Sequence, residues 1–295
     1  MRPIQCTHAS CKSEGPIVRF GFFRRREDGR RIQRFRCQTC RRTFSSATLL
    51  PTYRQKKRRL NATIERLLVR KMNLSHIASF LGTTKKTVAR KFCFLGNQRW
   101  AEFNNAPGPR GLLHIQFDEM QSSEHTKCKP IAIPIAVDAR NYKILAFDVC
   151  SMPAQHPLTQ ISLRKYGPRR DDRPAAIERV LRRVAPMIRP GGMITTDRAP
   201  RYPEPIARIL PHAQHLAHRS RKARRAGQGE LKKIGYDPLF PLNHTAAMVR
   251  DHTSRLVRQT WANTKRIDHL RHHLAILAHA YNRYRDEHPV QAARA

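Results

Sequence analysis

Apolar and polar side chains alternate along the stretch GLLHIQFDEMQSSE. Leu113, Ile115 and Phe117 fall on one face of an extended segment, because successive side chains of a strand point to opposite faces. The alternation predicts a strand that ends by presenting Asp118 on the other face. Glu119 is expected to point away from Asp118, and we do not expect it to bind metal.

Two further strand-like runs follow in CKPIAIPIAVDARNYKILAFDV, residues 128 to 149. Apolar runs on both sides of a polar turn at residues 138 to 141 predict a hairpin that pairs with the first strand. Pro134 has no N–H to donate inside a central strand. It therefore indicates a bulge or a different strand boundary.

A helix and a fourth strand complete the pattern. RPAAIERVLRRVAPMI, residues 173 to 188, has Pro174 at its start and a helical spacing of apolar residues. Gly191 and Gly192 then turn the chain into MITTD, a short strand that is expected to end at Asp197.

Strand, strand, strand, helix, strand is the order of the ribonuclease-H-like fold, an α/β fold with a mixed sheet flanked by helices. Its first and fourth strands lie side by side, so Asp118 and Asp197 are expected to be neighbours. Adjacent carboxylates repel unless a cation neutralises them, and hard oxygen ligands suit Mg²⁺ or Mn²⁺. Such a cation activates an attacking oxygen in phosphodiester cleavage. Capping a turn at the end of a strand is the alternative role for each aspartate.

The segment LSHIASFLGTTKKTVARKF, residues 74 to 92, predicts two helices joined by a sharp turn at Gly82. Thr83 or Thr84 can cap the second helix. That helix is expected to present basic side chains to a DNA groove, namely Lys85, Lys86, Arg90 and Lys91. The layout is that of a helix-turn-helix. A packed pair of helices with a solvated basic face is the alternative.

Four of the seven cysteines form two pairs near the start of the chain, Cys6 with Cys11 and Cys37 with Cys40. Four thiolates can surround Zn²⁺ tetrahedrally, and bound metal supplies folding energy that a small polar segment lacks. The spacing predicts a structural zinc ribbon. The step between the first two cysteines is wide, so His8 is a competing ligand.

The charge of the chain narrows its partners. Lys and Arg number 58 against 21 Asp and Glu, which gives a formal net charge of +37. So many positive charges repel one another unless a polyanionic partner offsets them, and nucleic acid is the commonest polyanion. No apolar run approaches the length of a membrane span, so we expect a soluble protein that is not secreted and has no membrane partner. A basic structural RNA-binding protein is an alternative that does not explain the two aspartates.

Composition predicts a division of the chain at the Pro- and Gly-rich stretch NNAPGPRG. The predicted parts are a zinc ribbon at residues 1–47, a helix-turn-helix at 55–100, a catalytic α/β domain at 111–285 and a frayed tail at 286–295.

Together these motifs resemble bacterial insertion-sequence transposases of the DDE superfamily, especially the insertion-element-one type. The resemblance is carried by QRFRCQTCRRTFS, the helix-turn-helix, FDEM at 117–120, TTDRAPRY at 195–202 and RLVRQTWANTK at 255–265. It implies a cytoplasmic, nucleoid-associated bacterial enzyme that binds the ends of a mobile element in double-stranded DNA. It also implies cleavage and strand transfer by three residues that bind Mg²⁺ or Mn²⁺, within a homo-oligomer.

In that family the third acid is a glutamate that opens a helix before the R-L-x-R-x-T stretch. The corresponding position here is Asn243, so the catalytic, metal-binding set would be Asp118, Asp197 and Asn243. An asparagine oxygen can bind Mg²⁺, but it brings no charge and cannot act as a base. An N-cap is the alternative role for Asn243, and Glu230 and Asp251 are alternative third ligands. The departure also fits a catalytically inactive, transposase-derived DNA-binding protein or transposition regulator.

A helix from Asn243 to about residue 262 is expected to turn its apolar side chains toward a core. Arg250 on this helix is expected to approach a DNA phosphate, with an ordinary surface arginine as the alternative. The basic insertion at 219–233 is expected to contact DNA. Histidines of the late helix HLRHHLAILAHAYN are expected to pack or to face phosphate rather than to bind metal.

Overall fold

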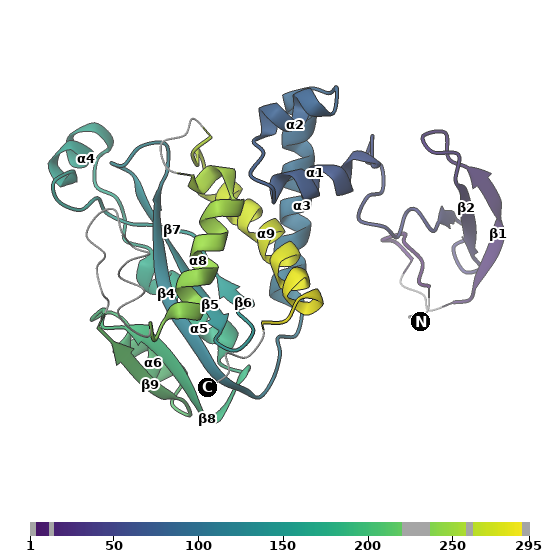
Figure 1. Ribbon diagram of the computed structural model, residues 1–295. Coiled ribbons are helices and arrows are strands. Elements are labelled where there is room, and N and C mark those ends of the chain that lie inside the picture. The colour runs from purple at the N-terminus through teal and green to yellow at the C-terminus, as the bar shows by residue number, and fades with distance from the viewer. Residues whose placement is uncertain (1–3, 12–14, 220–236, 258–261, 291–295) are drawn as a thin grey trace. The chain divides into compact units, whose positions relative to one another are not determined.

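The structure, a computed structural model, describes residues 4–11, 15–219, 237–257 and 262–290 (Figure 1). The chain divides into two compact units, Met1–Thr63 and Ile64–Ala295. The predicted insertion at 219–233, which includes Glu230, lies almost wholly outside the described residues. The finer division into four parts stays a prediction.

The first unit contains a small antiparallel sheet of order β1-β2-β3. Its strands are β1 (Ile17–Arg24), β2 (Arg31–Cys37) and β3 (Thr43–Ser45). The rings of Phe35 and Phe44 pack 5.6 Å apart across β2 and β3. A bulge interrupts the pairing of β1 with β2 between Arg19 and Phe22, where Gly21 adopts φ +72°. A positive φ is easiest for glycine, so Gly21 makes this bulge accessible.

The second unit is built on a mixed six-stranded sheet of order β6-β5-β4-β8-β9, with β7 paired to β5. The strands are β4 (Leu112–Ser123), β5 (Pro130–Asp138), β6 (Ile144–Phe147), β7 (Cys150–Ser151), β8 (Ile188–Asp197) and β9 (Gln214–His218). The first three pair antiparallel, whereas β4 with β8 and β8 with β9 are parallel. The predicted pairing of the first strand with the hairpin and with the fourth strand is therefore confirmed.

Helices cover both faces of this sheet (Figure 1). One face packs against α5 (Arg173–Val184) and α6 (Pro203–Ile209) through Ile115, Phe117 and Ile194. The other packs against α8 (Phe240–His252) and α9 (Ile267–Glu287) through the alternate residues of β5. The short helices α4 (Thr159–Tyr166) and η1 (Ser254–Leu256) complete the described elements of this part of the unit. The predicted α/β class, with helices on both sides of a mixed sheet, is confirmed.

Three helices precede the sheet, α1 (Leu60–Leu68), α2 (Leu74–Phe80) and α3 (Lys85–Asn105), and α3 packs against α9. Gly82 makes the turn with φ +54°, and the hydroxyl of Thr84 caps α3 by accepting from the N–H of Thr87 at 3.2 Å. At Gly96 a Cβ atom would come within 2.2 Å of His272 Cβ, so glycine permits the close approach of α3 to α9.

The basic residues of α3 do not all face solvent. Lys85, Lys86 and Arg90 are exposed, as expected for a DNA-facing surface. Lys91 is only 4% exposed, so its predicted exposure was wrong. It lies beside Phe92 and one turn after Val88, both fully buried, and therefore follows the helix face that packs inward.

Several strand and helix boundaries differ from the predicted ones. β4 continues to Ser123 instead of ending at Asp118, because the whole of β5 pairs with residues Ile115 to Ser123 of β4. Pro134 causes no bulge against β4. The carbonyl of Pro134 accepts from the N–H of Asp148, so the ring nitrogen of Pro134 also faces away from β4. On that side it lies in the gap between β6 and β7, where no strand needs an N–H donor, so no ladder bond is lost. The predicted helix from Asn243 to 262 instead spans Phe240–His252.

Four elements had no sequence signal: α4, α6, β7 and β9. The strand QHLAH is short and mostly accessible, and it pairs through its backbone with β8. α9 continues to Glu287, two residues into the predicted tail, and residues 291–295 are outside the described range. None of the described helices is long and apolar enough to cross a membrane.

His273 of α9 makes stability depend on pH. It is fully buried, and its Nε2 donates to the carbonyl of Leu68 at 3.1 Å, in agreement with the predicted packing role. Burial lowers its pKa from 6.5 to about 4, and the charge of Arg255 adds to the effect. Between these two pH values only the unfolded chain binds the proton, so stability is full above pH 6.5 and falls toward pH 4. The expected loss is about 3 kcal/mol.

Urea unfolding of the second unit at several pH values measures this loss. His273→Leu should abolish that part of the pH dependence, whereas the exposed control His212→Gln should keep it. Equal slopes in all three proteins would contradict the assignment.

Candidate carboxylate and cysteine sites

Parallel pairing of β4 with β8 brings the two predicted aspartates together. Gln116 lies opposite Thr195 in this ladder, and Asp118 and Asp197 each follow two residues later. β8 ends at Asp197, whereas β4 runs on past it. Asp197 also pairs with His218, the last residue of β9. The aspartates therefore share the carboxyl edge of the parallel strands, as the sequence predicts.

Asp118 is held where ionisation is unfavourable. Burial raises its pKa to about 6, and the negative charges of Asp197 and Glu119 act in the same direction. The N–H of Glu119 donates to Asp118 Oδ1 at 2.7 Å and offsets part of the rise. Asp197 Oδ1 accepts from the N–H of Ala199 at 3.0 Å, which orders the chain beyond β8. A bound cation would relieve the repulsion between these carboxylates.

Tyr202 joins the site although sequence reasoning did not select it. Its hydroxyl lies 3.1 Å from Asp118 Oδ1 and 3.0 Å from Glu119 Oε2, and its ring packs on Phe117 at 5.1 Å. The side chain of Glu119 is only 1% exposed and is ion-paired with Arg201. One hydroxyl thus links the two acids of the opening motif. The only sequence signal for Tyr202 was its place at the end of the TTDRAPRY motif. A tyrosine five residues after an aspartate has no chemical signature of its own.

The start of α8 is tied to the middle strand of the sheet. The amide of Gln116 donates to the carbonyl of Pro238 at 2.8 Å and accepts from the N–H of Leu242 at 3.0 Å. Gln116 is 1% exposed and lies two residues before Asp118 on β4. This buried amide therefore fixes where the first turn of α8 lies relative to the carboxylates.

Asn243 is exposed in that first turn, and its Nδ2 donates to Asp237 Oδ2 at 2.9 Å. It is not the N-cap, because α8 already begins at Phe240 and Asp237 accepts from the N–H of Leu239 at 3.0 Å. The capping alternative for Asn243 was therefore wrong, because the N-cap position of α8 is Leu239 and Asn243 lies inside the helix. Its predicted part in metal binding stays a prediction.

The other predicted residues of α8 lie toward its far end. Asp251 is eight residues, or about 12 Å, beyond Asn243 along the helix and forms an ion pair with Lys71 at 2.6 Å. This pairing gives Asp251 a different role from that of a third ligand. Arg250 is exposed, which agrees with either of its predicted roles.

Comparison with known proteins adds no identity. No known protein-family model matches this chain, and no curated protein is significantly similar to it. The function must therefore be inferred from the arrangement of the residues themselves.

The paired cysteines of the first unit converge in space. The Sγ atoms of Cys6, Cys11, Cys37 and Cys40 all lie within 4.8 Å of one another. Within the described residues, no other group of three or more cysteine, histidine or acidic side chains has its ligand atoms this close together. His8 is not part of the cluster. Four cysteines so placed can bind a metal such as zinc.

Two distances test that fit. Cys6 Sγ lies 3.7 Å from Cys40 Sγ, and Cys11 Sγ lies 3.8 Å from Cys37 Sγ. Zinc–sulfur bonds of 2.3 Å give tetrahedral edges of about 3.8 Å. The backbone N–H of Cys40, assisted by that of Thr39, lowers the pKa of the Cys37 thiol to about 6. A thiolate is the form that binds metal, so the turn after β2 prepares this ligand.

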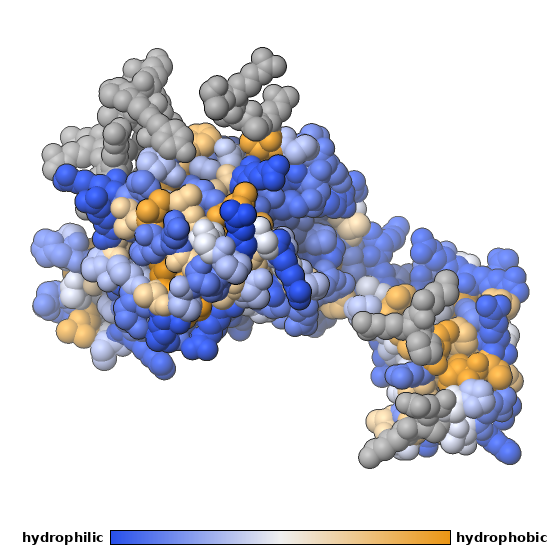
Figure 2. Space-filling model, turned by 90° about the horizontal axis from the view of Figure 1, so that it is seen from below, coloured by the Kyte–Doolittle hydropathy of each residue, from blue (hydrophilic) through white to orange (hydrophobic). Residues whose placement is uncertain are grey.

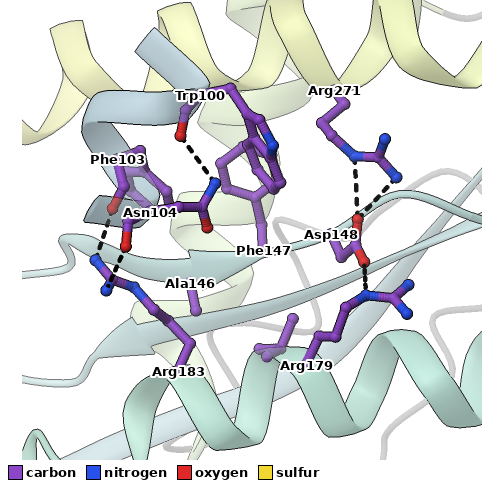
Figure 3. Close-up of a pocket in the computed structure, with 10 residues that line it drawn as sticks. Trp100, Phe103, Asn104, Ala146, Phe147, Asp148, Arg179, Arg183 and Arg271 are labelled. Carbon is purple, nitrogen blue, oxygen red and sulfur yellow. Dashed lines mark hydrogen bonds and ion pairs between the residues drawn. The ribbon is translucent and has the colours of Figure 1, made fainter. Parts of the chain in front are cut away.

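A separate cavity of about 320 Å³ lies between α3, α5, α9 and the end of β6 (Figure 3). Asp148, 4% exposed, binds Arg179 Nε at 2.7 Å and Arg271 at 3.1 Å. Arg183 donates to the carbonyl oxygens of Phe103, Asn104 and Ala106 at the end of α3. These partners explain why charged groups can line a half-buried space, and the cavity contains no residue of the carboxylate site.

Proposed function

We propose that the protein is a DNA transposase that binds the ends of a mobile element and carries out metal-dependent DNA cleavage and strand transfer. One observation carries the proposal. The parallel pairing of β4 with β8 brings Asp118 beside Asp197, in a chain of net charge +37. In a chain that binds phosphate through its positive charge, a pair of acids can hold a metal cation against the bound phosphate.

The topology supports the same proposal. Numbered within the second unit, the principal strands run in the order 3-2-1-4-5, with the first three antiparallel and the last two parallel to the first. This is the arrangement expected of a ribonuclease-H-like fold. Helices on both faces and the two acids at the edge of strands one and four fit that fold.

Asp118 and Asp197 have the chemistry to hold Mg²⁺ or Mn²⁺. Their oxygens are hard ligands, and a cation would relieve the repulsion that raises the pKa of Asp118. When bound, the metal supplies a nucleophilic oxygen and stabilises the leaving one. Tyr202 positions Asp118 through its hydroxyl, and Gln116 fixes the start of α8. Asn243 can contribute a neutral amide oxygen from that turn.

The N-terminal part would supply DNA binding. The four-cysteine cluster with its three-stranded sheet fits a zinc ribbon. The pair α2 and α3, with Gly82 at the turn and Thr84 at the cap, fits a helix-turn-helix. Figure 2 shows a mainly hydrophilic surface on the second unit. We expect the protein to act as a homo-oligomer on double-stranded DNA in the bacterial nucleoid.

A second candidate is a catalytically inactive transposase relative that regulates transposition by binding DNA. The observation that favours it is Asn243, which stands where the family has a glutamate and hydrogen-bonds to Asp237. A neutral amide leaves the metal site one negative charge poorer. The two candidates differ in cleavage and agree in DNA binding.

The deciding experiment is cleavage of a labelled duplex carrying the inverted repeats that flank the gene, with Mg²⁺ or Mn²⁺. Wild type is compared with Asn243→Ala and Asn243→Glu. Nicking by wild type that is lost in Asn243→Ala supports an Asp-Asp-Asn site. No nicking by wild type but nicking by Asn243→Glu supports the regulator. Repeat-specific binding without nicking by any of the three, and without metal binding, would sink the enzyme proposal.

The exposed face of α3 gives a prediction on binding. Lys85→Ala and Arg90→Ala should each weaken duplex binding and reduce the slope of log affinity against log salt by about one, because each phosphate contact releases about one counterion. Fluorescence anisotropy at four salt concentrations measures the slope. Arg283→Ala, at an exposed position of α9 paired with Glu287, is the matched control. An unchanged slope in both α3 variants would remove this helix from the DNA contact.

A further inference from the structure

The first unit exposes phenylalanines on an edge strand. Phe20 and Phe23 of β1 are 42% and 41% exposed, and β1 is the outer strand of its sheet. Large aromatic side chains are normally buried, so two on one strand need an explanation. Figure 2 shows hydrophobic residues at the surface of this unit among hydrophilic ones.

The register places these rings among arginines. Phe23 lies opposite Ile32, and side chains of β2 at every second position share that face, including Arg34 and Arg36. The guanidinium carbons of Arg34 and Arg36 lie 5.3 and 5.4 Å from the centre of the Phe20 ring. We call Phe20, Phe23, Arg34 and Arg36 the β1 platform.

Phe22 on the opposite face differs. It is 50% exposed, but Arg31 stacks on its ring with the guanidinium carbon only 3.8 Å from the ring centre. That ring face is already occupied by a protein group. Arg34 and Arg36 also lie over the Phe20 ring, but at the longer distances given above, and the side chain remains 42% exposed, so part of the ring is accessible to a planar partner.

The charge of this hairpin selects the partner. Residues 17 to 37 contain eight arginines and two acids. Both acids are already paired, Glu27 with Arg58 and Asp28 with Arg25. The platform therefore combines partly exposed aromatic rings with positive charge that is not offset by the acids of the hairpin. A partner that matches must present flat apolar faces and negative charge at short intervals.

From this combination we propose that the β1 platform binds single-stranded DNA, with unpaired bases stacked on Phe20 and Phe23 and phosphates held by Arg34 and Arg36. Duplex DNA does not suit the platform, because its base faces are covered by neighbouring base pairs. Stacking on aromatic rings tolerates any base, so the binding is expected to be independent of sequence. The inference goes beyond the proposed cleavage activity and does not require it.

The test measures binding of the full chain to a labelled single-stranded 15-mer and to the duplex of the same sequence. Fluorescence anisotropy is recorded without Mg²⁺ and without chelator, so that neither cleavage nor loss of zinc intervenes. Phe20→Ala and Phe23→Ala should each weaken single-strand binding about tenfold and change duplex binding less than about twofold. Phe20→Tyr keeps the ring and should retain affinity. Phe22→Ala, on the other face, and Leu50→Ala, another exposed apolar residue of the same unit, are controls.

Four results would overturn the proposal. Platform variants can bind the single strand as tightly as wild type, or can lose single-strand and duplex binding equally. They can also change the oligomeric state in sedimentation without affecting single-strand affinity, which would make the face a contact between copies. Tighter binding of RNA than of DNA of the same sequence would overturn the assignment to DNA. Zinc content of one ion per chain in every variant confirms that the unit is folded.

Discussion

Replacing Asp118 or Asp197 with asparagine is expected to lower metal-dependent cleavage of the repeat duplex by at least about a thousandfold. Each carboxylate contributes charge to the proposed metal site, and metal assistance is worth several kcal/mol of transition-state stabilisation. Duplex affinity without metal should be unchanged or slightly higher, because each variant removes a negative charge that repels phosphate. Single-turnover cleavage and anisotropy together separate the two effects. If only the Asn243→Glu background cleaves, the comparison is made there.

Asp251→Asn is the matched control. Asp251 is also an aspartate of the second unit, but it is paired with Lys71 at the far end of α8. Its loss should leave cleavage within about twofold of the parent, as expected of a surface ion pair. Cleavage retained by either Asp118→Asn or Asp197→Asn would remove these residues from catalysis. Cleavage lost in Asp251→Asn as well would reinstate it as a third ligand.

Removing the metal from the four-cysteine cluster, or replacing Cys37 with serine, is expected to unfold the first unit. The described strands of this unit bury few large side chains, among them Ile32, Phe35 and Phe44. Structural zinc in small domains supplies about 10 kcal/mol or more of folding free energy, which exceeds what so small a core can replace. Limited proteolysis and thermal unfolding should show loss of Met1–Thr63 and an unchanged transition for Ile64–Ala295.

Cys93→Ser provides the control, because Cys93 is a half-buried cysteine of α3 outside the cluster. It should keep one zinc ion per chain and a protected first unit. A Cys37→Ser protein that still binds one zinc ion and resists proteolysis like wild type would contradict four-cysteine ligation. His8 would then be the first residue to test as the replacement ligand.

Local patterns predicted much of the fold. The alternation before Asp118, the hairpin turn at residues 138 to 141 and the helix opened by Pro174 all depend on neighbours in sequence. Each is confirmed within a few residues of its predicted bounds. Errors occurred where pairing with a distant strand decided the outcome. β4 extends to Ser123 because β5 is long enough to pair with it, and Pro134 is tolerated because β6 and β7 leave a gap beside it.

The candidate site divides in the same way. Both aspartates and all four clustered cysteines could be selected from the sequence, since acids at predicted strand ends and paired cysteines have a recognisable chemistry. Tyr202 and Gln116 could not be selected. Their roles arise from hydrogen bonds to Asp118 and Leu242, which the pairing of strands and the packing of α8 bring within reach.

By itself, the sequence determined the positive charge, the cysteine pairs, the order of the four predicted strands and the helix opened by Pro174, and the identity of the two acids. These follow from residue type and short-range periodicity. Only the tertiary structure decided that Lys91 is buried, that Asn243 lies inside α8 instead of capping it, and that Phe20 and Phe23 stay exposed among arginines. The reason is physical. Burial, hydrogen-bond partners and local charge are set by atoms that meet only after distant segments have packed.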